Sequence, residues 1–158
     1  MGRKYRMDKN LQEVMGCTCL RMRRTTRRMT QLYDQALHDV GLTINQFGLL
    51  ANLYGVDLIR SQGLPIGAIA ERLGADPTTL NRTLKPLSAR GLIKDFSDPA
   101  DGRVRVIRIT EKGKRKLLKA IPLWRAAQAR VDGALGLERV SALNELLDLS
   151  GTRLAESV

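Results

Sequence analysis

Residues 76–110 constrain the fold more than any other stretch, because a two-faced helix is followed directly by a hairpin pattern. Asp76 and Pro77 predict the helix start, since an Asp side chain accepts hydrogen bonds from free backbone amides and proline fits the first helical position. One face of this helix carries three leucines at spacings of four and three, Leu80, Leu84 and Leu87. We expect that face to be buried and the opposite face to meet a partner.

A β-hairpin is predicted after this helix. Gly91 ends the helix, and an extended run over 92–96 leads to the turn-forming residues Asp-Pro-Ala-Asp-Gly at 98–102. The run that leads away, 103–109, is rich in β-branched residues, which favour strands. The order is therefore helix, strand, turn, strand.

Two prolines fall inside predicted helices. Pro86 removes one backbone hydrogen bond from the helix before the hairpin, at a cost of about 3 kcal/mol in a regular helix. We expect a bend near residues 82–85, and the alternative is that Pro86 ends the helix early. Pro122 predicts a kink in the long helix that Thr110 and Glu111 begin.

Further helices are predicted on both sides of this segment. The first is expected from about Val14 to Val40, ended by Gly41, and the last from about Leu137 to Ala155. Thr43 and Gln46 form a capping box for a helix from Ile44 to about Ile59. Residues 64–65 are expected to add a short strand to the hairpin, and residues 66–73 to form a short helix that ends at Gly74.

Composition indicates one folding unit that binds a polyanion. The 158 residues are 43% hydrophobic and carry a net charge of +11. Residues 71–116 hold twelve Lys and Arg against six Asp and Glu, whereas residues 117–158 hold five of each. Residues 1–40 hold nine Lys and Arg against four Asp and Glu, so the positive excess avoids the C-terminal residues and its largest share lies on the helix and hairpin. We therefore expect nucleic acid as the partner rather than a membrane surface. The basic run 21–28 is either a solvated face or a surface near the DNA backbone.

Several classes of protein are disfavoured by the same residues. No apolar run approaches the roughly 20 residues that span a bilayer, and the basic N-terminus lacks the features of a signal peptide, so we expect a cytoplasmic protein. Cys17, Cys19 and the single His38 are too few for an ordinary zinc site, so no metal or cofactor is expected. We find no pairing of nucleophile and base that indicates an enzyme.

Three pieces of sequence, taken in order, resemble the winged helix-turn-helix of the MarR (multiple antibiotic resistance regulator) family of bacterial transcription factors. They are IGAIAERLGADPTTLNRTLKPLSARGLI, the Asp101-x-Arg103 of the hairpin tip and the RITEKG that opens the next helix. The resemblance extends from about Val14 to Glu156. It implies a mainly α fold with a small β-hairpin wing. In this single unit, 1–158, residues 44–110 would form the DNA-binding region and residues 14–40 and 111–156 the dimerisation helices.

The resemblance also implies roles for individual residues at a DNA surface. Thr78, Thr79, Asn81, Arg82 and Lys85 are placed at base edges and nearby phosphates, because Arg pairs with guanine and Asn with adenine. Arg103 is expected to enter a flanking minor groove, with Asp101 orienting it, and Arg105 to contact a phosphate.

A second resemblance concerns Cys19. Residues 27–33, Arg-Arg-Met-Thr-Gln-Leu-Tyr, are similar to a pattern of the organic hydroperoxide regulators, a MarR branch, and this alignment places Cys19 at the reactive-cysteine position. Tyr33 then falls at one of the two tyrosines that hold the sulfur, and Arg23 replaces the other. The alternative is that Cys19 is an inert small residue.

These observations predict a sequence-specific transcriptional regulator. We expect a homodimeric repressor that binds a palindromic operator in double-stranded DNA and is released by a small aromatic or phenolic ligand. One alternative is a thiol-based peroxide-sensing repressor that uses Cys19. Another is a non-specific DNA-binding protein, which would share the charge but would not need hydroxyl and amide groups on the helix.

Overall fold

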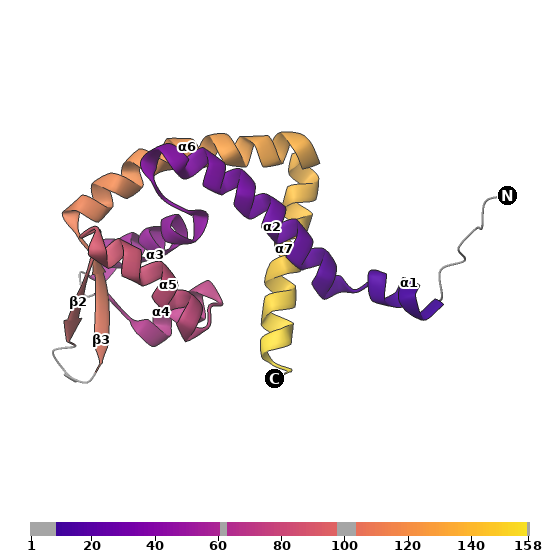
Figure 1. Cartoon of the computed structure of the whole chain (residues 1–158), viewed down its shortest axis with the longest axis horizontal. Helices are drawn as coiled ribbons and strands as arrows, with labels where there is room; N and C mark the ends of the chain where they lie inside the picture. Colours follow the sequence, from indigo (N-terminus) through magenta and orange to yellow (C-terminus); the bar gives the residue numbers. More distant parts are fainter. Residues whose placement is uncertain (1–8, 61–62, 98–103, 158) are drawn as a thin grey trace.

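Helices and a small antiparallel sheet make up the part of the chain that the computed structural model describes, residues 9–60, 63–97 and 104–157 (Figure 1). In chain order the elements are α1 (Lys9–Met15), α2 (Thr18–Leu37), the 3-10 turn η1 (His38–Val40), α3 (Ile44–Arg60), β1 (Leu64–Pro65), α4 (Ile66–Leu73), α5 (Pro77–Ala89), β2 (Ile93–Ser97), β3 (Arg105–Ile109), α6 (Glu111–Leu135) and α7 (Leu137–Ala155). The predicted fold class, mainly α with a β-hairpin wing, is confirmed.

The sheet has the order β1-β3-β2, and both pairings are antiparallel. The short strand predicted at residues 64–65 is present and pairs with β3, with Leu64 opposite Ile107. Because side chains alternate along a strand, one face of the β2–β3 hairpin carries the buried Ile93, Ile107 and Ile109. The opposite face carries Phe96 and Arg108.

The main core lies where α3, α4, α5, the sheet and the first half of α6 meet. Leu80, Leu84 and Leu87 of α5 are all buried there, as their spacing predicts. Phe47 of α3 stacks on Trp124 of α6 with ring centroids 5.9 Å apart. A smaller cluster of Tyr33, Ala127 and Val131 joins α2 to α6.

The prediction of one continuous first helix is wrong. Instead, α1 ends at Met15 and α2 begins at Thr18. The backbone of Cys17 is extended, with ψ 123°, and the Gly16 amide donates to the carbonyls of Gln12 and Glu13 at 3.0 Å each. Gly16 is not in a left-handed conformation, so the break is made at Cys17 without a left-handed glycine cap. At the other end, Gly41 ends the segment in a left-handed conformation, as expected.

The helix of residues 77–89 passes through Pro86 and continues to Ala89, so the alternative in which this proline ends the helix is wrong. The Pro86 carbonyl accepts from the Arg90 amide at 3.2 Å, so the helix continues on its C-terminal side. The bend near residues 82–85 stays a prediction. Pro122 likewise lies inside α6.

The caps predicted at the starts of α3 and α6 are confirmed. The Thr43 amide donates to Gln46 Oε1 at 3.2 Å, and the Gln46 amide donates back to Thr43 Oγ1 at 3.3 Å. Thr110 Oγ1 accepts from the Gly113 amide at 3.0 Å and also donates to the Gly91 carbonyl at 2.8 Å. The Thr110 hydroxyl therefore joins the residues that follow α5 to the start of α6.

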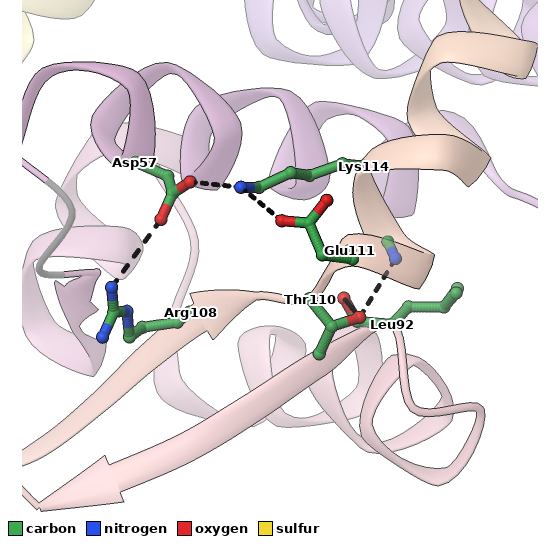
Figure 2. A network of polar contacts seen from close by, with 7 residues as sticks. Asp57, Leu92, Arg108, Thr110, Glu111 and Lys114 are labelled. Atoms are coloured by element: carbon green, nitrogen blue, oxygen red, sulfur yellow. Dashed lines mark hydrogen bonds and ion pairs between the residues drawn. The ribbon is translucent and has the colours of Figure 1, made fainter.

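A polar network joins the hairpin to α3 and α6 (Figure 2). Asp57 of α3 accepts from Lys114 Nζ of α6 at 2.7 Å and lies 3.9 Å from a guanidinium nitrogen of Arg108 in β3. Glu111 also binds Lys114, at 2.8 Å. These carboxylates raise the pKa of Lys114 above its ordinary value, so the lysine stays charged. The network joins α3 to the segment from β3 to the start of α6, about fifty residues further along the chain.

Figure 1 shows how the longer helices extend from this core. Helix α6 leads away from the sheet with α2 beside it. Helix α7 turns down from the far end of α6, and α1 lies at the end of α2 away from the hairpin. Several large apolar side chains of these outer helices are exposed, namely Leu11, Val14, Met15, Leu20, Leu137, Leu146, Leu149 and Leu154. No helix in the described ranges is long and apolar enough to span a membrane.

Candidate nucleic-acid interface

Asp76 organises the start of α5. Its Oδ1 accepts from the amides of Thr78 and Thr79 at 2.9 Å each, and its Oδ2 accepts from the Thr79 hydroxyl at 2.6 Å. These hydrogen bonds, the one from the Thr79 hydroxyl above all, lower the pKa of Asp76 below its ordinary value. The cap therefore stays ionised at neutral pH and holds the first turn in place.

The side of α5 away from the core is exposed from Thr78 to Ser88. Side chains that face solvent there are Thr78, Thr79, Asn81, Arg82, Lys85 and Ser88. Every residue of α5 predicted to contact DNA is thus on the surface. The Thr79 hydroxyl is already used by the cap, so in this structure Thr79 contributes to helix geometry.

A hollow of about 490 Å³ lies between α5 and the hairpin. Asn81, Lys85 and Ser88 line it from the helix, and Asp95 and Arg105 line it from β2 and β3. The structure therefore brings three of the predicted DNA contacts together, Asn81, Lys85 and Arg105. The carboxylate of Asp95 lies among these side chains.

That carboxylate is the partner of Arg105. The Arg105 guanidinium donates to Asp95 Oδ2 across the hairpin, and both side chains remain open to water, with 62% and 40% of their surfaces exposed. In this structure Arg105, predicted as a phosphate contact, is an ion-pair partner. Its charge is therefore partly neutralised before any DNA arrives.

The two faces of the hairpin carry different chemistry. On the face away from α5, the Arg108 guanidinium carbon lies 5.6 Å from the centre of the Phe96 ring, a cation–π distance. Arg108 also reaches Asp57, so this face is tied to the helices. Asp101 and Arg103, predicted at the hairpin tip, lie outside the described residues.

Cys19 and Tyr33 do not meet within one chain. Both lie on α2, fourteen residues apart in the sequence, which corresponds to about 21 Å along a helix. Tyr33 is buried and its hydroxyl donates to Gln128 Oε1 of α6 at 2.6 Å. Burial, with a smaller contribution from the charge of Asp132, raises the pKa of the Tyr33 phenol. Cys19 is an exposed free thiol beside Arg23, in a hollow of about 950 Å³ that Leu154 of α7 also lines.

Two acidic residues of the interface region were missed by the sequence reasoning. Asp95 could have been found from the alternation of the two strands, because the register places it diagonally across from Arg105 on one face. Asp57 has no local signal, since its partners lie about fifty residues further along the chain. No cluster of His, Cys, Asp and Glu suited to a metal ion occurs among the described residues.

Comparison with known proteins places this geometry among transcriptional regulators. A model described as the MarR family matches residues 40–104. The chain is 50% identical over 52 residues to the uncharacterized HTH-type transcriptional regulator YxaD of Bacillus subtilis (strain 168). That match spans 33% of this chain and 36% of YxaD.

Two solved structures of DNA complexes are similar over most of the chain. The Mycobacterium tuberculosis transcriptional regulator MosR in complex with DNA is 34% identical, covers 90% of this chain and 99% of its own, and has a TM-score of 0.74. The transcriptional repressor CouR bound to a 23-mer DNA duplex is 25% identical, covers 88% of this chain and 95% of its own, and has a TM-score of 0.75. A structure of CouR from Rhodococcus jostii RHA1 bound to p-coumaroyl-CoA, 24% identical with a TM-score of 0.65, shares the fold.

Proposed function

We propose that this chain, which belongs to the MarR family of transcriptional regulators, is a homodimeric, sequence-specific repressor and has no enzymatic activity of its own. The observation that carries the proposal is the exposed side of α5, where Asn81, Arg82 and Lys85 face solvent beside the basic hairpin. Side chains of these types can hydrogen-bond to base edges in a major groove. MosR and CouR have both been solved with DNA.

The proposed dimer uses the outer helices. Residues 14–40 and 111–156 would pair with a second copy, and residues 44–110 would bind DNA. The exposed leucines of α7 support this assignment, because a contiguous apolar surface is costly in water and typical of an interface. Two such copies would bind an imperfect palindrome in the cytoplasm, with half-sites about one helical turn, roughly 10 base pairs, apart.

Release from DNA is proposed to follow the binding of a small aromatic or phenolic ligand. CouR, one of the relatives above, has been solved with p-coumaroyl-CoA bound. Such a ligand would act by binding the DNA-free arrangement of the two winged units more tightly than the DNA-bound arrangement.

The test is selection of a binding site from a random duplex library of about 24 base pairs, long enough for two half-sites. The expected result is an enriched, imperfectly palindromic sequence bound as a dimer. Its affinity at physiological salt should exceed that for a shuffled duplex by about 10³ or more. Enrichment of no sequence, with equal binding to all duplexes, would favour the non-specific DNA-binding alternative.

Peroxide sensing through Cys19 is a second candidate, because that thiol is exposed and lies beside Arg23. An organic hydroperoxide would transfer its terminal oxygen to the thiolate, giving a sulfenic acid and the corresponding alcohol. The test compares release of the selected duplex by peroxide for the parent chain and for Cys19→Ser. Equal release from both, or no release from the parent, removes this candidate.

A further inference from the structure

We propose that Asp95 is a specificity-determining residue of the DNA interface, because it keeps Arg105 from contacting the phosphates of DNA that does not match the binding site. The inference rests on the proposed function, and it says how the proposed DNA-binding surface distinguishes a matching sequence from an unrelated one. It concerns an acidic residue in a place where a surface built only for affinity would carry none.

The position of the hollow gives Asp95 this role. When a winged helix binds DNA, its reading helix enters a major groove and its hairpin meets the adjacent minor groove. One sugar–phosphate strand separates those two grooves. The hollow lies between α5 and the hairpin, so this strand would pass over it. Lys85 and Arg105 are the cations there, and Asp95 is the only acid among the described residues that line the hollow.

The hairpin register holds Asp95 and Arg105 together. Asp95 is opposite Ile107 and Arg105 is opposite Ser97, so the two residues are diagonal neighbours on the face that looks toward α5. Ile93, Ile107 and Ile109 of the same face are buried, which anchors the base of the hairpin. The ion pair therefore has a rigid support at one end and open water at the other.

An ion pair in this position can exchange partners. Both side chains are substantially exposed, so water and salt screen their attraction and the pair is weak. A phosphate oxygen that comes close enough can replace the carboxylate as the acceptor for Arg105. A phosphate that stays further away meets an arginine whose charge Asp95 already offsets.

Specificity follows from how closely the strand approaches. On a matching sequence, hydrogen bonds from α5 to the base edges seat the helix in its groove and bring the phosphate strand into the hollow. On an unrelated sequence the helix does not seat, and Arg105 stays with Asp95. The carboxylate thus lowers the part of the binding free energy that does not depend on sequence.

The experiment uses the full-length chain, the selected duplex and a shuffled duplex of the same composition, with affinities measured from 50 to 200 mM salt. Asp95→Asn frees Arg105 to contact phosphates of the shuffled duplex. The slope of log affinity against log salt should steepen by about 0.9 for that duplex, which is about a 3.5-fold change in affinity ratio across this salt range. The slope for the selected duplex should change little, so the loss of preference for it should be about 3.5-fold greater at 50 mM than at 200 mM salt.

Two comparisons decide the outcome. Glu13→Gln removes one negative charge from an exposed position of α1, outside the proposed dimer and DNA-binding segments, and should leave both slopes unchanged. In a chain that also carries Arg105→Gln, Asp95→Asn should have no effect on either slope, because Asp95 acts by forming an ion pair with Arg105. An equal gain on both duplexes, or the same gain without Arg105, overturns the inference. If no duplex is enriched in the selection, the proposed function itself fails.

Discussion

At the scale of single residues, Arg82 is the cation of α5 assigned to reading bases, since it is exposed and lies outside the hollow beside the hairpin. Arg82→Ala should cost about 1–3 kcal/mol on the selected duplex and relax the preference at one base pair. Arg103→Ala should instead weaken binding to all duplexes and lower the salt slope by about one. The measurement is a panel of single-base variants of the selected duplex.

Arg125→Ala is the control for base preference, because Arg125 is exposed on α6, in the proposed dimer arm and away from the proposed DNA-binding segment. It should leave the panel unchanged. A uniform loss of affinity for Arg82→Ala, with no base pair affected more than another, would assign Arg82 to the phosphate backbone.

The Asp76 cap should make the stability of the fold depend on pH. Its pKa lies below the ordinary value of 3.8, mainly because the Thr79 hydroxyl donates to the carboxylate. A lowered pKa in the folded state means that the charged carboxylate stabilises the fold above pH 3.8, and that this contribution is lost as the pH falls through the folded pKa. Asp76→Asn keeps an oxygen acceptor but removes the charge.

The free energy of unfolding in urea should therefore be higher for the parent than for Asp76→Asn at about pH 6, and this difference should shrink between about pH 5 and pH 3. Other carboxylates titrate in both chains, so the difference isolates Asp76. A difference that does not change with pH would show that the hydrogen bonds, and not the charge, carry the cap.

At the scale of elements, Gly113 sets how closely α6 packs against the end of α5. It is buried in the first turn of α6, and a Cβ added there would overlap the Leu92 carbonyl oxygen and lie 2.8 Å from Ile109 Cγ1. Gly113→Ala should therefore lower the free energy of unfolding by about 1–3 kcal/mol, although alanine favours a helix. Urea unfolding measures the change.

Gly55→Ala is the matched substitution in the interior of α3. A Cβ at Gly55 would meet no atom within 4 Å, and its φ is not positive. Alanine should there raise the free energy of unfolding by about 0.5–1 kcal/mol through helix propensity. Opposite signs at the two glycines are the expected result, and destabilisation at both would point to a role for Gly55 that its open surroundings do not explain.

At the scale of the whole molecule, the proposed dimer depends on apolar side chains of α7. Leu146 and Leu149 are separated by three residues, so they share one face, and 62% and 54% of their surfaces are exposed in the single chain. Replacing both with Glu should weaken dimerisation by about 3 kcal/mol or more, since burying each leucine contributes about 1.5–3 kcal/mol. Sedimentation at micromolar concentration should show a dimer for the parent and a monomer for the variant.

The control is Leu58→Glu, which changes an exposed leucine of α3 outside the proposed arms. It should remain dimeric. Both variants should keep the circular dichroism of the parent, because none of the three leucines belongs to the buried core. A monomeric parent that binds the selected duplex with full affinity would contradict the dimer model.

The sequence by itself determined every element whose signals are local. The Asp76 and Thr110 caps, the glycine ends at Gly41 and Gly91 and the leucine spacing in α5 depend on residues within about one helical turn of each other. Such interactions are encoded by short spacing, so they can be read without a fold. The position of the exposed side of α5 follows from the same periodicity.

Only the tertiary structure decided what those elements bring together. The break between α1 and α2 falls at Gly16 and Cys17, inside a segment where one helix from about Val14 was expected. Folding brings Asp57 to Lys114 and Arg108, which lie far from it in the sequence. The Tyr33 hydroxyl donates a hydrogen bond to Gln128 on another helix. Asp95 lies beside Arg105 because the hairpin register, and not sequence distance, sets which side chains are neighbours. The contacts of Asp57 and Tyr33 depend on how distant surfaces pack, which no local pattern specifies.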